Sequence, residues 1–191
     1  MLSMKKLLLI LILTLNFQSW TKADDVSDFE IQGLTLGDSL LQMYSKKEIK
    51  ELLKTDSNFY PSSKKYLLLA TKGKDKNFDQ LNIDLKYNDK GYIIYGLSQY
   101  RRIEYKNCLN DMKIIFKDMK RIFTQGKYKL NEYTNTHRGD SSGNSKYTSA
   151  DFDFNDGSSL RIVCTDWGKE FEADNYHDNI DVSLASSKFN N

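Results

Sequence analysis

The sequence predicts an α+β fold in which an antiparallel sheet, or a pair of such sheets, carries helices on one face. Two stretches, 81–97 and 150–162, alternate apolar and polar residues around a short turn that contains glycine, which is typical of half-buried β-hairpins. Two others, 38–54 and 105–123, place apolar residues at helical spacing. Because helices do not alternate with the individual strands, a doubly wound parallel sheet is disfavoured.

The first helical segment is predicted in two pieces that meet at Ser45. Asp38 or Ser39 can cap the first piece, since a short side-chain oxygen accepts a hydrogen bond from a free backbone N–H one turn on. Ser45 and Glu48 have the spacing of a capping box, in which the two side chains satisfy two backbone donors reciprocally. The two pieces are expected near 38–44 and 46–54.

The two hairpins are predicted to share one loop class, a three-residue loop with glycine in third place. This loop keeps the apolar residues of both strands on one face, and glycine accepts the left-handed conformation that the third position needs. The loops are then Asp89-Lys90-Gly91 and Asn155-Asp156-Gly157. The predicted pairs are Tyr87 with Ile93, Leu85 with Tyr95 and Ile83 with Leu97 in the first hairpin, and Phe152 with Leu160, Asp151 with Arg161 and Ala150 with Ile162 in the second.

The second helix, 105–123, has a single apolar stripe, as a helix that covers a sheet does. Asn107 is its expected N-cap, and Gly126 lies near its expected end. Further strands are expected at 65–71, 127–133 and 180–185.

The resulting order is helix, strands, helix, strands. This order suggests a duplicated unit of one helix and three strands, with halves at 30–103 and 104–186. The two halves have no residue-by-residue repeat, so residues 24–191 are predicted as one α+β domain.

Residues 1–23 are predicted to be a signal peptide. Lys5 and Lys6 precede an apolar core that is shorter than the roughly 20 residues needed to span a bilayer. Small residues before the expected cut, after Ala23, suit a signal peptidase. The alternative is an uncleaved membrane anchor. The cleaved form is expected to be periplasmic or secreted, without membrane association.

Removal of this segment leaves a nearly neutral chain. Three of the 28 basic residues and none of the 26 acidic residues precede residue 24, so the mature net charge is −1. Interspersed charge of this kind gives no electrostatic reason to expect a nucleic-acid partner.

Cys108 and Cys164 are the two cysteines of the chain. In an exported protein, two cysteines suggest one disulfide. The alternative, a metal site, lacks the close ligand spacing that zinc sites have. Neither a metal nor a cofactor is predicted.

A serine-hydrolase hypothesis comes from two short strings. Gly37-Asp38-Ser39-Leu40 resembles the nucleophile block of the GDSL, or SGNH, esterase family, and Asp174-Asn175-Tyr176-His177 resembles its Asp-x-x-His. The resemblance implies Ser39 as nucleophile, His177 as base and Asp174 as the residue that orients the histidine. The family's oxyanion glycine and Gly-x-Asn-Asp blocks are not found, and its parallel sheet disagrees with the predicted hairpins.

Three other patterns could bind a ligand, but each has a simpler interpretation. Arg138-Gly139-Asp140 matches an adhesion tripeptide inside a polar loop. The run from Asp151 to Gly157 resembles the start of a calcium loop, but its glycine is one place late and the closing Glu is missing. The acidic residues of the last loop are typical of a solvated connection. They are Asp166, Glu170, Glu172, Asp174 and Asp178.

A further resemblance covers more of the chain. The pattern Ile-x-Gly-Leu-x-Leu-Gly-Asp-Ser at 31–39, and the following Ser-Lys-Lys-Glu-Ile-Lys, resemble a group of small exported bacterial proteins of unknown function, as do Asp156-Gly157, Cys164 and Asp166-Trp167. The glycine-rich lead-in to a helix and strands is also similar to the outer-membrane assembly small-protein-A fold and to β-lactamase-inhibitor-type repeats. Those modules bind proteins, although the lipid-anchor cysteine of the former is absent here.

The leading hypothesis is therefore a non-catalytic periplasmic or secreted module. It is expected to bind an envelope or periplasmic protein, or to stay associated with the envelope.

Overall fold

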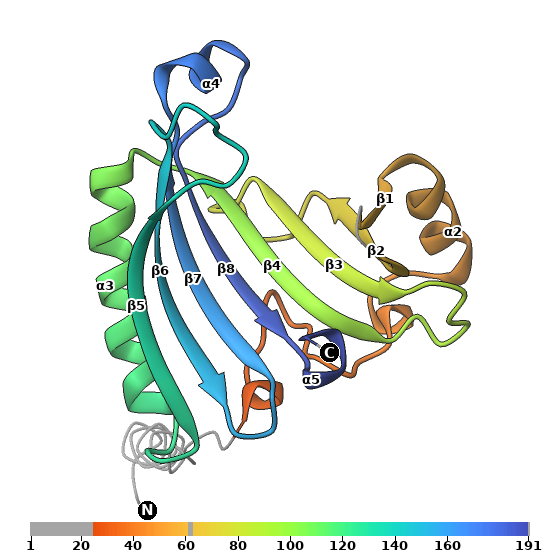
Figure 1. The fold of residues 1–191 in the computed structure, drawn as a ribbon. Helices are drawn as coiled ribbons and strands as arrows, with labels where there is room; N and C mark the ends of the chain where they lie inside the picture. Colours follow the sequence, from red (N-terminus) through yellow and green to blue (C-terminus); the bar gives the residue numbers. More distant parts are fainter. Residues whose placement is uncertain (1–24, 61–62, 191) are drawn as a thin grey trace, which may run out of the picture.

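The computed structural model describes residues 25–60 and 63–190 (Figure 1). The predicted signal peptide, 1–23, lies outside the described residues. The described chain builds one eight-stranded antiparallel sheet in the order β1-β2-β3-β4-β8-β7-β6-β5. The predicted α+β composition and antiparallel sheet are confirmed.

Within residues 25–60 and 63–190, four helices and two short 3-10 helices lie around the sheet. The helical elements are η1 (Val26–Asp28), η2 (Leu40–Gln42), α2 (Lys46–Thr55), α3 (Tyr105–Ile122), α4 (Lys169–Ala173) and α5 (Ser187–Asn190). The strands are β1 (Ser57–Tyr60), β2 (Ser63–Thr71), β3 (Gln80–Lys86), β4 (Ile94–Arg102), β5 (Tyr128–Thr136), β6 (Lys146–Phe154), β7 (Ser159–Asp166) and β8 (Asn179–Ala185).

Four strands follow each long helix. The sequence predicted only three after the first helix and four after the second, although the proposed repeat unit counted three in each half. The missed strand β1 is short, and its exposed middle residues give no apolar alternation. The first four strands run in chain order from one edge of the sheet and the last four from the other, so β4 and β8 meet in the middle. All eight strands therefore share one continuous surface.

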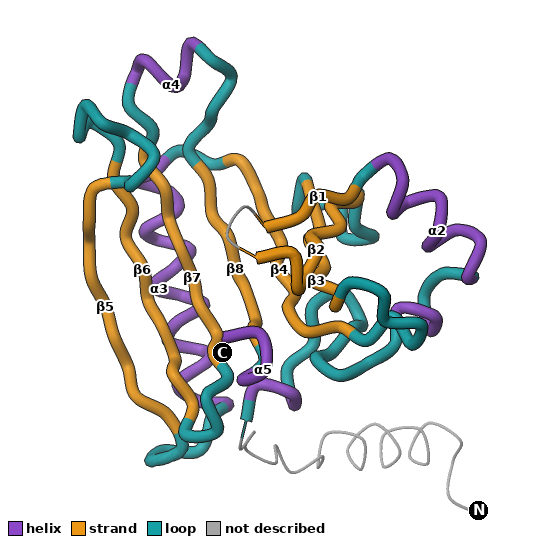
Figure 2. Tube along the Cα trace, turned by 45° about the vertical axis from the view of Figure 1, so that its right-hand side comes forward, coloured by secondary structure: helices purple, strands orange, loops and turns teal. Residues whose placement is uncertain are grey.

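An apolar row crosses six strands of the sheet and forms the centre of the core. Its members are paired in register and buried: Leu69, Ile83, Leu97, Leu184, Leu160 and Phe152. Helix α3 packs on this side of the sheet, where the rings of Phe116 and Phe152 lie 5.0 Å apart. Figure 2 shows α3 behind β6 and β7. None of the described helices is long and apolar enough to cross a membrane.

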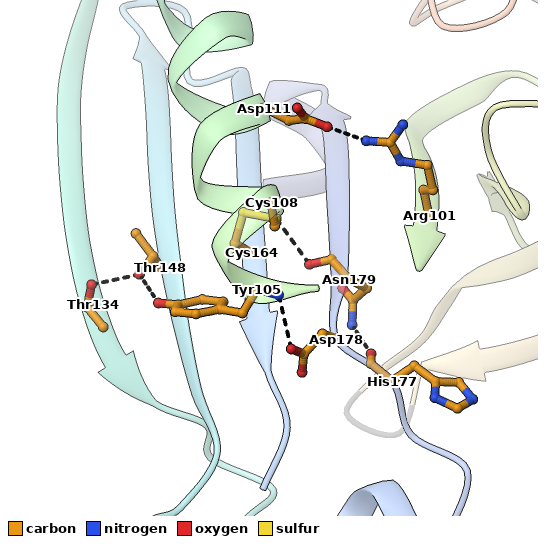
Figure 3. Close-up of a disulfide and its surroundings, with 10 residues drawn as sticks. All are labelled: Arg101, Tyr105, Cys108, Asp111, Thr134, Thr148, Cys164, His177, Asp178 and Asn179. Carbon is orange, nitrogen blue, oxygen red and sulfur yellow. Dashed lines mark hydrogen bonds and ion pairs between the residues drawn. A yellow bond between two sulfur atoms is a disulfide. The ribbon is translucent and has the colours of Figure 1, made fainter. Parts of the chain in front are cut away.

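The predicted disulfide joins α3 to β7. Cys108 and Cys164 are both fully buried, and their Cα atoms are 5.8 Å apart (Figure 3). The helix begins one turn earlier than the predicted cap at Asn107. Glu104 occupies the N-cap position without a side-chain cap, and the carboxylate of Asp178 instead accepts from the Tyr105 N–H at 3.0 Å. Asp178, from a loop distant in the sequence, therefore caps the helix in place of Asn107, which the sequence predicted as the N-cap.

The second hairpin confirms the sequence prediction in full. Phe152 pairs with Leu160, Asp151 with Arg161 and Ala150 with Ile162. The three-residue loop closes with a hydrogen bond from the Phe154 N–H to the Ser158 carbonyl, and Gly157 has φ +88°. The third-position glycine is needed because other residues rarely adopt that conformation.

The first hairpin differs from the prediction near its turn. Ile83 pairs with Leu97 as expected, but Leu85 pairs with Ile94 because the register shifts between Asp84 and Leu85. The carboxylate of Asp89 accepts from two backbone N–H groups of the loop and holds a longer turn. Positive φ falls on Asn88 and Tyr92, and Gly91 is not left-handed.

The jointed N-terminal segment is confirmed. The Ser39 hydroxyl caps η2 and the Ser45 hydroxyl caps α2, and Glu48 completes the capping box. Backbone hydrogen bonds then attach this segment to the first residue of β4. The Gly37 N–H donates to the Ile94 carbonyl, and the Ile94 N–H donates to the Asp38 carbonyl, both at 2.9 Å.

The disulfide closes a span of 56 residues, and its removal should destabilise the fold strongly. Chain-entropy models give roughly 4 kcal/mol for such a loop, and typical measured values are about 2–4 kcal/mol. We expect the Cys108→Ala/Cys164→Ala variant to lose about this much free energy of unfolding in urea. Reductant should lower the stability of the native protein and leave that of the variant unchanged. Equal stability of the reduced and oxidised proteins would contradict this account.

Candidate binding surface on the open face of the sheet

The face of the sheet turned away from α3 carries a polar row. Side chains alternate between faces along a strand, so the residue next to each member of the apolar row points to the opposite side. These neighbours pair in register from β3 to β6: Asn82, Ser98, Ser183, Arg161 and Asp151. Figure 2 shows the strands β5 to β8 uncovered on this side, which we call the open face. Helix α5 lies at one end of it, where Phe189 packs on Tyr66.

Asp84 is the most deeply buried carboxylate at the β1 end of the open face. Its side chain lies over Gly96, where a Cβ would collide with the carboxylate, and the Tyr60 hydroxyl donates to it at 2.6 Å. Only 8% of Asp84 is exposed. Burial raises the pKa of Asp84 to about 6, although the hydrogen bond from Tyr60 opposes this rise. Burial, together with the charge of Asp84, also raises the pKa of Tyr60 above its usual value.

Asp181 is a second carboxylate on the same face, opposite Tyr100. Burial raises the pKa of Asp181 to about 6, against the effect of hydrogen bonds from Ser98 and Ser183. The negative charge of Asp84 raises the pKa of Asp181 further, so the two carboxylates act on each other through the face. Their surroundings favour the protonated forms.

Asp151 is the third buried acid, 3% exposed, and it is held differently. Its carboxylate accepts from the Tyr133 hydroxyl at 3.1 Å, from the Arg161 Nε at 3.2 Å and from the Ser149 hydroxyl. The cross-strand pair of Asp151 and Arg161 was predicted from the sequence. Three donors from three strands fix this carboxylate, as a buried charge requires.

The open face therefore presents hydroxyls, carboxylates and tyrosine rings on a rigid sheet. Among the residues that the structure describes, no group of three or more His, Cys, Asp and Glu side chains could hold a metal ion. The calcium-like run forms the predicted hairpin, and its first two carboxylates accept from Arg161 and from the Asn131 amide.

The three residues of the esterase hypothesis are not brought together. Ser39 bridges Ile93, just before β4, and its hydroxyl donates to the Gly91 carbonyl at 2.5 Å. Asp174 and His177 precede β8, whose first residue pairs with the last residue of β4. The nine residues of β4 separate the two places by roughly 30 Å at about 3.3 Å per residue. The geometry gives the esterase hypothesis no support, because catalysis needs hydrogen-bond reach.

The adhesion tripeptide is also engaged within its own loop. The Asp140 carboxylate accepts from the backbone N–H groups of Ser142 and Ser145, and Asp140 is buried. Hydrogen bonds from Ser142 and then Ser145 hold the pKa of Asp140 well below its usual range. This carboxylate therefore orders its own loop.

Two acidic residues of the last loop have structural contacts. Asp178 accepts from the Tyr105 and Trp167 N–H groups, and Asp166 pairs with Lys146 at 3.3 Å. The same region contains an aromatic cluster in which His137 lies 4.3 Å from Trp167 between ring centroids.

No family model, curated protein or solved structure matches the chain.

Sequence patterns did not indicate that acids on the open face are buried. Asp84 and Asp181 stand at the polar positions of alternating strands, which usually face water. Tyr60, which donates to Asp84, belongs to β1, the strand that the sequence did not predict. The sequence feature that could have indicated this is Gly96 opposite Asp84, because a glycine in a strand often marks a place where another group approaches the backbone closely.

Because the pKa values of Asp84 and Asp181 are raised in the folded protein, we predict that these two residues lower the free energy of unfolding as pH rises. An acid with a folded-state pKa of about 6 and an unfolded value near 4 binds more protons when folded, so stability is lost between these pH values and stays lost above them. We expect Asp84→Asn/Asp181→Asn to be stabilised relative to the native protein by about 4 kcal/mol more at pH 7.5 than at pH 4.5, which is about 2 kcal/mol for each carboxylate.

Urea unfolding at the two pH values measures this double difference. Asp153→Asn, on the same face, is the matched control and should show no comparable pH-dependent gain. A constant difference between the Asp84/Asp181 variant and the native protein at both pH values would overturn the assignment.

Ser39 is predicted to act as a cap and not as a nucleophile. Ser39→Ala should cost about 1 kcal/mol of unfolding free energy through loss of the η2 cap, while Ser141→Ala in an exposed loop should stay within about 0.5 kcal/mol of the native protein. A fluorophosphonate probe should give no Ser39-dependent labelling. Labelling that disappears in Ser39→Ala would revive the esterase hypothesis.

Proposed function

We propose that this protein is an exported, non-catalytic module that binds another protein on the open face of its sheet. The observation that carries the proposal is the contrast between the two faces. One side of the central strands is a continuous buried apolar row, which α3 covers over β6, β7 and β8, and the other is a row of polar and aromatic side chains.

The carboxylates of this face support a binding role because their burial lowers the stability of the folded protein. Asp84 and Asp181 would be replaced by neutral residues if stability alone selected them, since burial raises the pKa of each above its usual value. Donors on a partner could satisfy them. Half-exposed Tyr100, Tyr133 and Tyr147 add the amphipathic rings that are enriched in protein interfaces.

Export is supported by two independent features. The predicted signal peptide provides the route, and the intramolecular disulfide of Cys108 and Cys164 is compatible with an oxidising compartment. We infer a periplasmic or secreted location, with an envelope or periplasmic protein as partner.

We also infer that the two halves arose by duplication of a unit of one helix and four strands. The sequence of elements and the mirrored strand order support this. Leu53 of α2 lines a hollow with Leu67, which lies on the same side of β2 as the apolar row, so both long helices would cover one face. This arrangement suits the proposed kinship with small-protein-A and β-lactamase-inhibitor-type modules, and with the small exported proteins that share the 31–39 pattern.

Photo-crosslinking in the producing cells tests the proposal. A benzoylphenylalanine at Asn82 or Val163, both on the open face, should give a discrete adduct of one partner protein. The same residue at Lys117, exposed on α3, is the matched control and should give none. The purified partner should then bind the native protein, and Val163→Arg should abolish binding, because a bulky charge in the middle of the face blocks contact.

Two outcomes would contradict the proposal. One is an adduct from Lys117 and not from the open face. The other is a purified partner that binds Val163→Arg as tightly as the native protein.

A further inference from the structure

A basic hollow lies at the α5 end of the open face. Its volume is about 470 Å³, and it is formed by residues of β2, β3, β4 and the C-terminal helix α5. The lining residues are Lys65, Tyr66, Lys86, Tyr95, Ser187 and Lys188.

Tyr66 forms the fixed wall of this hollow. It is buried, it pairs across the strands with Lys86, and its hydroxyl donates to the Lys188 carbonyl at 2.8 Å. The ring of Tyr95 lies 5.3 Å from it and that of Phe189 5.0 Å. The aromatic wall therefore holds Lys86 and Lys188 in place relative to each other.

The charge of the lining has one sign. Of the six described residues that line it, three are lysines and none is acidic. Lys86 pairs with Tyr66 across the strands, and the Lys188 carbonyl accepts from the Tyr66 hydroxyl, so both lysines start from positions next to Tyr66. Within the described chain neither forms an ion pair, and the Asp84 carboxylate two residues before Lys86 accepts from Tyr60.

A concave site lined by one sign of charge concentrates counter-ions, because its apolar walls focus the field. This matters here because the mature chain as a whole is almost neutral, so the basic hollow is a local departure from the average charge. Ammonium groups on different elements can bind separate oxygens of one anion, and charge-assisted hydrogen bonds are the strong ones.

We propose that this hollow binds a small molecule that carries a phosphate or sulfate ester group. Lys86 and Lys188 bind the anion, and the rings of Tyr66 and Tyr95 contact the organic part of the ligand. Lys65, whose ammonium lies 5.2 Å from the centre of the Tyr66 ring, adds positive charge at the rim. The site is independent of whether the rest of the open face binds a protein.

Isothermal titration calorimetry with phenyl phosphate and phenyl sulfate tests the proposal on protein purified after expression of the full sequence. Each probe combines an ester anion with an aromatic ring, and the tighter of the two indicates which ester the site prefers. We expect saturable binding of at least one probe by the native protein. Lys86→Gln/Lys188→Gln should weaken it by about tenfold or more, since two charge-assisted contacts are lost.

Lys47→Gln/Lys50→Gln is the matched control, because it removes the same charge from the exposed side of α2. Its affinity should equal that of the native protein. A thermal unfolding midpoint unchanged in both variants shows that folding is intact. The proposal is overturned if the native protein binds neither probe, or if the two double variants lose affinity equally.

Discussion

The antiparallel pairing of β4 with β8 is the constraint on which the rest of the structure depends. Seven residue pairs, from Gly96 with Ala185 to Arg102 with Asn179, join the two four-stranded halves into one sheet. This seam places Leu97 against Leu184 on the core side and Ser98 against Ser183 on the open side. Without it, neither the apolar row under α3 nor the polar row opposite would be continuous, and Asp181 would not lie within reach of the field of Asp84.

The disulfide and the caps act around this seam and keep it in place. Cys108 ties α3 to β7, next to β8, and Asp178 at the start of β8 caps α3. On the other side, the segment around Gly37 and Asp38 binds the first residue of β4. The covered side is thus fixed by covalent, apolar and backbone contacts, which leaves the open side free to carry groups that burial disfavours.

Sequence patterns correctly predicted the parts of the fold that depend on interactions between residues close together in the chain. The capping box of Ser45 and Glu48 and the register of the second hairpin follow from spacing alone. The first hairpin was predicted, but its register near the turn differs because Asp89 holds a longer turn than its glycine suggested. Asp84 and Asp181 looked like ordinary solvent-facing residues, since their burial depends on Tyr60 and on strands far away in the sequence. The candidate surface could therefore not be predicted from the sequence. Ser39 and His177, which were predicted from a motif, lie at opposite ends of β4.

The central claim is that the open face is the working surface of the protein. Hydroxyl-radical labelling of intact producing cells, compared with the purified protein, tests it most directly. We predict that Tyr100, Tyr133 and Tyr147 on the open face are protected in cells, while Ile114 on the outer side of α3, which is 61% exposed, is labelled equally in both samples. Equal labelling of the three tyrosines in the two samples, or protection of Ile114 in their place, would contradict the account.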